Sequence, residues 1–169
     1  MYIRWARALW QRQLEQFSSD TAVLANVVQA QALPAEESIR VVRRLRMLGP
    51  SNPVWTVNLA SVYAGAVRDV FYASSPTQLR AFAGPVRYRN MWQMRLPGVG
   101  PELAEELKSE LETSSDAALV GVTGELLVEQ LVVLREKGRT PQVLKSAAFG
   151  QQLVERARRL DPNNPEWLR

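Results

Sequence analysis

A ten-residue segment that occurs twice constrains the fold of this chain more than any other feature. Residues 46–55 read RMLGPSNPVW and residues 158–167 read RRLDPNNPEW, with Arg, Leu, Pro, Asn, Pro and Trp at the same places. The first Pro cannot continue a helix, the Asn is suited to cap the next helix, and the second Pro suits a first helical turn. The segment therefore predicts, at two places, that one helix ends and another begins.

Apolar residues recur at three- and four-residue steps along most of the chain, which predicts amphipathic helices. No segment shows the strict alternation of a strand. The expected helices cover about 2–17, Asp20 to Pro34, Pro34 to about Leu48, Asn52 to about Val70, Pro101 to Glu112, a long stretch from the cap at 113–116 to about Lys137, and Thr140 to Leu160, with caps at Asp20, Asn52, Ser114 and Thr140. We therefore predict a single all-α domain over 1–169, with about six to eight helices that are mostly antiparallel neighbours.

The repeated turn and its flanks resemble the tetratricopeptide repeat family, whose units end in a similar Leu-Asp-Pro-Asn-Asn-Pro turn. Residues 38–45 resemble the second helix of a unit, and 58–63 resemble the Asn-Leu-Gly-x-x-Tyr first helix. Gly150, Val154 and Ala157 stand at the matching places before the second turn. The resemblance implies antiparallel helix pairs stacked as a right-handed solenoid.

This sequence departs from the family pattern in several respects. Trp55 and Trp167 fall one residue early, Ala60 replaces a Gly, and Leu45 stands where the family prefers Ala. The two turns lie 112 residues apart, which is not a multiple of a period of about 34 residues. We therefore expect an irregular array, with an insertion at about 71–100 and the start of a further helix at 165–169.

The resemblance also implies a function, because the first helices of such pairs line a concave groove. The residues that the match would place there are Val54, Val57, Asn58, Ser61 and Ala64. They are apolar or small and lack the set of Lys and Asn residues with which some relatives bind a terminal carboxylate. The expectation is a protein-protein interaction scaffold whose protein or peptide partner the sequence does not identify.

The chain contains no Cys and no His. Thiolate catalysis, Cys-type metal sites, the usual general base and the commonest metal ligand are thereby excluded. We predict a non-enzymatic protein without a cofactor or a metal site.

A nucleic-acid-binding module is the alternative. Arginines alternate with aromatic residues over 87–95, and 96–104 resembles the helix-hairpin-helix motif, in which glycines let the backbone approach a phosphate. Glu102 and the acidic helix that follows would repel phosphate, which favours a simple tight turn in which Pro101 opens a helix. The residues that would bind nucleic acid are Arg87, Arg89, Arg95, Gly98 and Gly100.

Charge is unevenly distributed along the chain. Residues 1–100 carry twelve basic and five acidic residues, and 101–169 carry nine and twelve. Arg40, Arg43 and Arg44 share one helix face, for which a solvated surface is favoured over a site for phosphate or acidic peptide. Two Trp in the first helix are expected to pack in the core, with a partner-facing role as the alternative.

No run of about 18 apolar residues occurs, so we expect no membrane span. The N-terminal residues turn polar before a signal-like apolar segment accumulates. A soluble, cytoplasmic protein is therefore favoured.

Overall fold

The computed structural model describes residues 2–30, 33–72, 99–133 and 141–167. These residues form seven α-helices and one short 3-10 helix and contain no strand, which confirms the all-α prediction. The elements are α1 (Tyr2–Gln16), α2 (Thr21–Gln29), α3 (Ala35–Leu48), α4 (Pro53–Tyr72), α5 (Pro101–Thr113), α6 (Ala117–Val133), α7 (Pro141–Leu160) and η3 (Pro165–Trp167).

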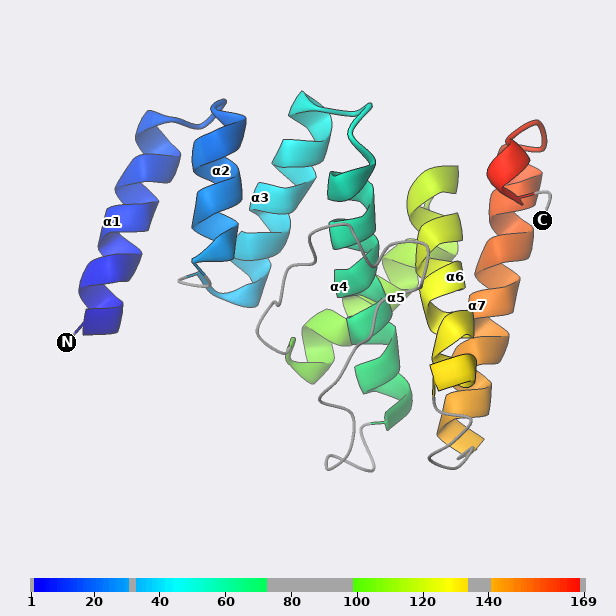
Figure 1. The fold of residues 1–169 in the computed structure, drawn as a ribbon. Coiled ribbons are helices and arrows are strands. Elements are labelled where there is room, and N and C mark those ends of the chain that lie inside the picture. Colours follow the sequence, from blue (N-terminus) through cyan, green and yellow to red (C-terminus); the bar gives the residue numbers. More distant parts are fainter. Residues whose placement is uncertain (1, 31–32, 73–98, 134–140, 168–169) are drawn as a thin grey trace.

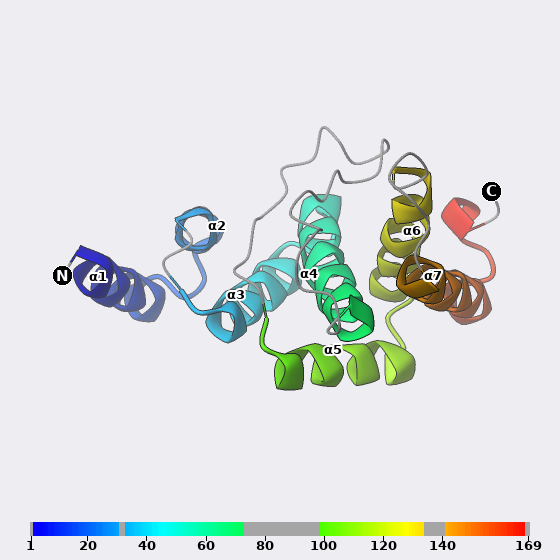
Figure 2. The ribbon, with the colours of Figure 1, turned by 90° about the horizontal axis from the view of Figure 1, so that it is seen from below.

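Six of the helices stand side by side in a row (Figure 1). Along the row the order is α1, α2, α3, α4, α6 and α7, and the two chain ends lie at its opposite ends. Helix α5 runs across the others, beneath α4 and between α3 and α6 (Figure 2). Helix α4 packs against α3, α5, α6 and α7, so it is the central helix of the fold.

The core is built around α4 because that helix has neighbours on several sides. Tyr63, near its middle, is the largest fully buried side chain of the described residues. Leucines from three other helices are also fully buried, which joins α3, α5 and α6 to the same core. These leucines are Leu45, Leu107, Leu111, Leu126 and Leu127.

The first copy of the repeated segment forms a tight hydrogen-bonded turn between α3 and α4. The Gly49 amide donates to the Leu45 carbonyl (3.0 Å) and the Asn52 amide donates to the Gly49 carbonyl (3.0 Å). The Asn52 side chain then accepts a hydrogen bond from the Val54 amide (3.1 Å), as an N-cap does.

The second copy forms the same three hydrogen bonds after α7. The Asp161 amide donates to the Ala157 carbonyl (2.9 Å) and the Asn164 amide to the Asp161 carbonyl (3.3 Å). The Asn164 side chain accepts from the Glu166 amide (3.0 Å). Of the further helix whose start was expected at 165–169, the structure describes Pro165–Trp167, which form a 3-10 turn.

Other predicted helix ends had mixed outcomes. Asp20 caps α2 by accepting from two backbone amides, as predicted. The cap predicted at Ser114 is wrong, because Asp116 accepts from the Leu119 amide (3.0 Å) while Ser114 accepts from the Asp116 amide (3.1 Å). Thr140 and most of the predicted insertion, 73–98, lie outside the described residues, and α4 continues to Tyr72.

Helices α6 and α7 cross at two glycines that face each other. A Cβ atom added to Gly124 would lie 2.6 Å from the Gly150 carbonyl oxygen and 2.9 Å from the Val154 amide nitrogen. A Cβ added to Gly150 would lie 2.8 Å from the Gly124 carbonyl oxygen. Because these atoms belong to backbone, neither site has room for a side chain.

Candidate partner-binding surface

Structure and sequence prediction differ on how accessible the five expected groove residues of α4 are. Val57, Asn58 and Ala64 are buried, so their side chains are not on the surface in this conformation. The side-chain amide of Asn58 donates to the Val54 carbonyl (2.9 Å), and the Ser61 hydroxyl donates to the Val57 carbonyl (2.8 Å). The reason for the burial is the central place of α4, which has helices on several sides. Partner binding by this set stays a prediction.

Besides Pro53, Trp55 and residues 69–71, α4 has four partly exposed residues that form a narrow line. They are seven, four and three residues apart and therefore share one face of the helix. Two of them, Val54 and Ser61, belong to the predicted groove set, and Arg68 forms an ion pair with Asp69 (3.5 Å). We call this line, which consists of Val54, Ser61, Gly65 and Arg68, the α4 strip.

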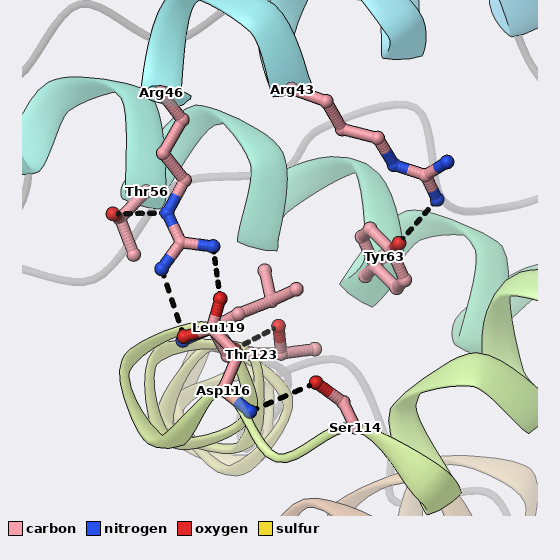
Figure 3. A network of polar contacts seen from close by, with 8 residues as sticks. All are labelled: Arg43, Arg46, Thr56, Tyr63, Ser114, Asp116, Leu119 and Thr123. Atoms are coloured by element: carbon pink, nitrogen blue, oxygen red, sulfur yellow. Dashed lines mark hydrogen bonds and ion pairs between the residues drawn. The ribbon is translucent and has the colours of Figure 1, made fainter. Parts of the chain in front are cut away.

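Arg46 of α3 connects three helices (Figure 3), and it contacts α4 on the face opposite the α4 strip, because Thr56 is two residues after Val54. Its Nε donates to Thr56 Oγ1 of α4 (3.0 Å), and its two terminal nitrogens contact the Asp116 carboxylate ahead of α6, one of them at 2.8 Å. Both members of this ion pair are only partly exposed. A two-pronged contact between a guanidinium and a carboxylate fixes orientation as well as distance.

Asp116 has two roles at once, as the partner of Arg46 and as the N-cap of α6. Burial alone would raise the pKa of Asp116, but hydrogen bonds from Arg46 and from the Leu119 amide outweigh it and lower the pKa. Within α6, Thr123 donates to the Leu119 carbonyl (2.7 Å), as Figure 3 also shows. The Asp116 carboxylate is therefore charged at neutral pH, and its ion pair with Arg46 joins the start of α6 to α3.

Arg43, one helical turn before Arg46, makes a second bridge. Its guanidinium donates to the Tyr63 hydroxyl of α4 (2.6 Å) and to Glu110 of α5 (2.6 Å), and lies 5.9 Å from the centre of the Tyr63 ring. Figure 3 shows how Arg43 reaches this hydroxyl. Burial raises the pKa of Tyr63 to about 12 although the Arg43 hydrogen bond opposes the shift. Tyr63 therefore keeps its proton at neutral pH.

The N-terminal helices are joined to α3 by further arginines. Arg44 donates to the Ser18 carbonyl and, at 3.4 Å, to the Ser19 hydroxyl, both between α1 and α2. Arg7 of α1 pairs with Glu37 of α3 (2.9 Å). Arg40 and Arg44 are exposed and Arg43 is partly exposed, which agrees with the solvated face predicted for these arginines, although Arg43 and Arg44 are long enough to reach other elements as well.

Arg156 of α7 closes the end of α5. Its guanidinium donates to the carbonyl oxygens of Leu111 (2.8 Å), Glu112 and Ser114 (2.6 Å). The last carbonyls of a helix have no partner within the helix, so a cation here satisfies them and offsets the negative end of the dipole. No sequence signal identified this contact, because Arg156 follows each of the three carbonyl residues by more than 40 positions in the chain.

The residues of the nucleic-acid alternative are largely beyond the described part. Arg87, Arg89, Arg95 and Gly98 lie outside the described residues. Gly100 is exposed at the N-terminus of α5, and Glu102 is exposed in the first turn of that helix. The acidic face that the sequence predicted next to this turn is thus on the surface.

Comparisons of the chain with protein-family models, with curated proteins and with solved structures gave no match. Among the described residues, no group of three or more acidic side chains is arranged to hold a metal ion. None of the described helices has both the length and the apolar character needed to cross a membrane.

Proposed function

We propose that this chain is a non-enzymatic scaffold that binds a protein or peptide partner along the α4 strip, within a tetratricopeptide-like stack of helices. The observation that carries the proposal is the repeated turn, which has the same three hydrogen bonds after α3 and after α7. A turn used twice in one chain is what an array of helix pairs requires.

The packing of α7 supports the tetratricopeptide-like part of this proposal. Gly150 and Ala157, two of the positions that match the family, are buried. Val154, the third, lies against Gly124 of α6. Small residues at a helix crossing let neighbouring helices approach closely, as stacked pairs must. The right-handed course of the stack belongs to the proposal as well.

Bridges on the opposite face of α4 hold the helix that carries the α4 strip in place. Arg43 and Arg46 contact α4 at Tyr63 and Thr56, and they also reach Glu110 of α5 and Asp116 ahead of α6. A surface that is ordered before binding loses less conformational entropy when a partner binds. Ser61 and Gly65 are small, so the backbone of an extended peptide could approach α4 closely there.

Affinity capture from the source cells, followed by direct titration with the purified partner, tests this proposal. Ser61→Arg places a long side chain on the strip without removing a core residue, and we expect it to weaken partner binding by about tenfold or more. Met47→Ser is the matched control, because Met47 is exposed on α3 away from the strip. The proposal fails if Ser61→Arg binds the captured protein like the parent.

The nucleic-acid alternative stays a prediction that a gel-shift assay at low salt addresses. Phosphate contacts release counterions, so genuine binding should weaken steeply as salt is raised. Gly98→Asp should abolish it while the helical circular dichroism signal is retained.

A further inference from the structure

Helix α1 carries two separate apolar faces, and only one of them is covered. Trp10 and Leu14 pack against the core. Trp5 and Leu9 are 67% and 41% exposed, and they stand four residues apart on one line of the helix. The expectation that both Trp residues of this helix pack in the core is therefore wrong for Trp5.

The uncovered line lies at one end of the row of helices (Figure 1). The outer helix of a stack usually presents a polar face, because no further helix covers it. At the opposite end, α7 meets this rule for much of its length, with Gln151, Gln152 and Glu155 exposed. The α1 end presents a Trp and a Leu instead, which is the arrangement expected of a contact face.

The charge around this line is positive. Arg12 continues it, three residues after Leu9, and is exposed. In the described part of the chain Arg12 makes no hydrogen bond or ion pair, whereas Arg7 is paired with Glu37. The charged residues of α1 are Arg4, Arg7, Arg12 and Glu15, which give a net charge of +2.

We propose that Trp5, Leu9 and Arg12 form a docking site for an amphipathic helix of another polypeptide whose apolar stripe is flanked by acidic residues. This surface is separate from the α4 strip, so the inference goes beyond the proposed function. Trp and Arg are both enriched among the residues that dominate binding energy at interfaces. Residues four apart form the ridge that fits between the side chains of a second helix.

The size and charge of the site favour a helix over the other occupants. From Trp5 to Arg12 the line spans about 10 Å along the axis, at 1.5 Å per residue. Its three side chains are far fewer than the roughly 20–30 residues per side of a standard interface between folded proteins. Pairing two copies through α1 would also bring together two helices of like charge. A membrane surface would receive only two apolar side chains.

Two labelled synthetic peptides are the probes that test the site. Both form helices with the same leucine stripe, and they differ only in having Glu or Lys beside it. We expect saturable fluorescence anisotropy with the acidic peptide and an affinity for the basic peptide that is lower by about tenfold or more.

Substitutions in α1 then locate the binding site. We expect Trp5→Ala and Leu9→Ala each to weaken the acidic peptide by about fivefold to tenfold, since each removes an apolar contact. Arg12→Glu should reverse the preference between the two peptides. Met47→Ser, which alters a residue that is 81% exposed on α3, should leave binding unchanged. Ser61→Arg should also leave it unchanged, which separates this site from the α4 strip.

Four results would overturn the inference. One is equal affinity for the two peptides, and another is α1 variants that bind the acidic peptide like the parent. A third is a concentration-dependent dimer in analytical ultracentrifugation that Trp5→Ala abolishes, because the face would then join two copies. The fourth is Trp5-dependent binding to phosphatidylglycerol vesicles without binding of the acidic peptide, because the face would then meet lipid.

Discussion

Helices α6 and α7 are held together in a different way from α3 and its neighbours. At the α6–α7 crossing, the backbones of Gly124 and Gly150 lie so close together that a Cβ added to either would collide with the carbonyl oxygen of the other. Helix α3 shares apolar core with α4 and in addition reaches α4, α5 and α6 through the long side chains of Arg43 and Arg46. The α6–α7 contact is thus a close contact between backbones, whereas α3 contacts its neighbours in part through long polar side chains.

The difference bears on which end of the molecule can adapt. A backbone contact has one geometry, so any added atom forces the helices apart. Arginine bridges can adjust their rotamers, exchange partners with water and change with pH. We therefore expect the α6–α7 pair to be the rigid base of the fold, and the α1–α3 end, where the proposed helix-docking site lies, to be the adaptable end.

The steric side of the comparison gives the largest expected effect. Gly150→Ala places a methyl group against the Gly124 carbonyl and Leu127, so α6 and α7 must separate. We expect a loss of about 2–4 kcal/mol in the free energy of unfolding, as for other overpacked cores. Gly65→Ala is the control, because a Cβ there meets nothing within 4 Å. It should be neutral or stabilise α4 by up to about 1 kcal/mol. Equal denaturation midpoints for the two variants would disprove the close contact.

Asp116→Ala removes a helix cap and the partner of Arg46 together. We expect it to cost about 1–3 kcal/mol, mainly from the lost cap, because the ion pair is partly exposed. The pKa of Asp116 is lowered in the folded state, so its contribution is present above the usual carboxyl pKa and is lost as pH falls through the folded value.

Urea unfolding at a series of acidic pH values measures both effects of Asp116. Asp116→Asn keeps a capping oxygen but loses the charge, so it should be less harmful than Asp116→Ala and should flatten the acid dependence. If the parent and Asp116→Asn lose stability in parallel below about pH 4, the ion pair with Arg46 does not stabilise the fold.

Arg156→Met should have a smaller effect, because water can replace part of what is lost. The change removes the donor shared by the carbonyls of Leu111, Glu112 and Ser114 but retains an apolar stem. We expect a loss of about 1–2 kcal/mol, with faster amide exchange in the last turn of α5. Uniform acceleration over the whole chain would show that Arg156 stabilises the fold globally and not this helix end.

Tyr63→Phe is expected to have the smallest effect, about 0.5–1.5 kcal/mol, since it removes one hydrogen bond from Arg43 and leaves the ring in place. In the parent, tyrosinate absorbance should show one of the four tyrosines titrating at about 12. Because the pKa of Tyr63 is raised in the folded state, protonated Tyr63 contributes its full stabilisation below the usual tyrosine pKa of about 10. This contribution is lost as pH rises through the pKa of Tyr63 in the folded protein. A Tyr63→Phe titration identical to that of the parent would contradict the assignment.

Much of the local structure follows from short-range sequence signals. Asp20 and Asn52 were identified as caps because a short polar side chain before an apolar helical run satisfies free amides. The same rule led to the wrong cap at Ser114, since Asp116 is an equally good cap and only the folded chain shows which one accepts from the helix.

The parts that the sequence did not reveal depend on contacts between distant residues. Arg46 and Asp116 are 70 residues apart, and no local pattern indicates that they meet. Five positions of α4 were expected in a groove, but a helix with neighbours on several sides buries most of such a set, here Val57, Asn58 and Ala64. The exposure of Trp5 was missed because an apolar residue at helical spacing is usually covered.

Residue-resolved hydrogen exchange under native conditions tests most directly whether the fold has a rigid base and an adaptable end. The account predicts that α6 and α7 amides around Gly124 and Gly150 exchange only with global unfolding, whereas amides of α1 to α3 exchange through smaller openings. Arg46→Met should accelerate exchange in α3 and leave α7 unchanged. Equal protection along the whole row, or faster exchange in α6 and α7 than in α1 to α3, would contradict it.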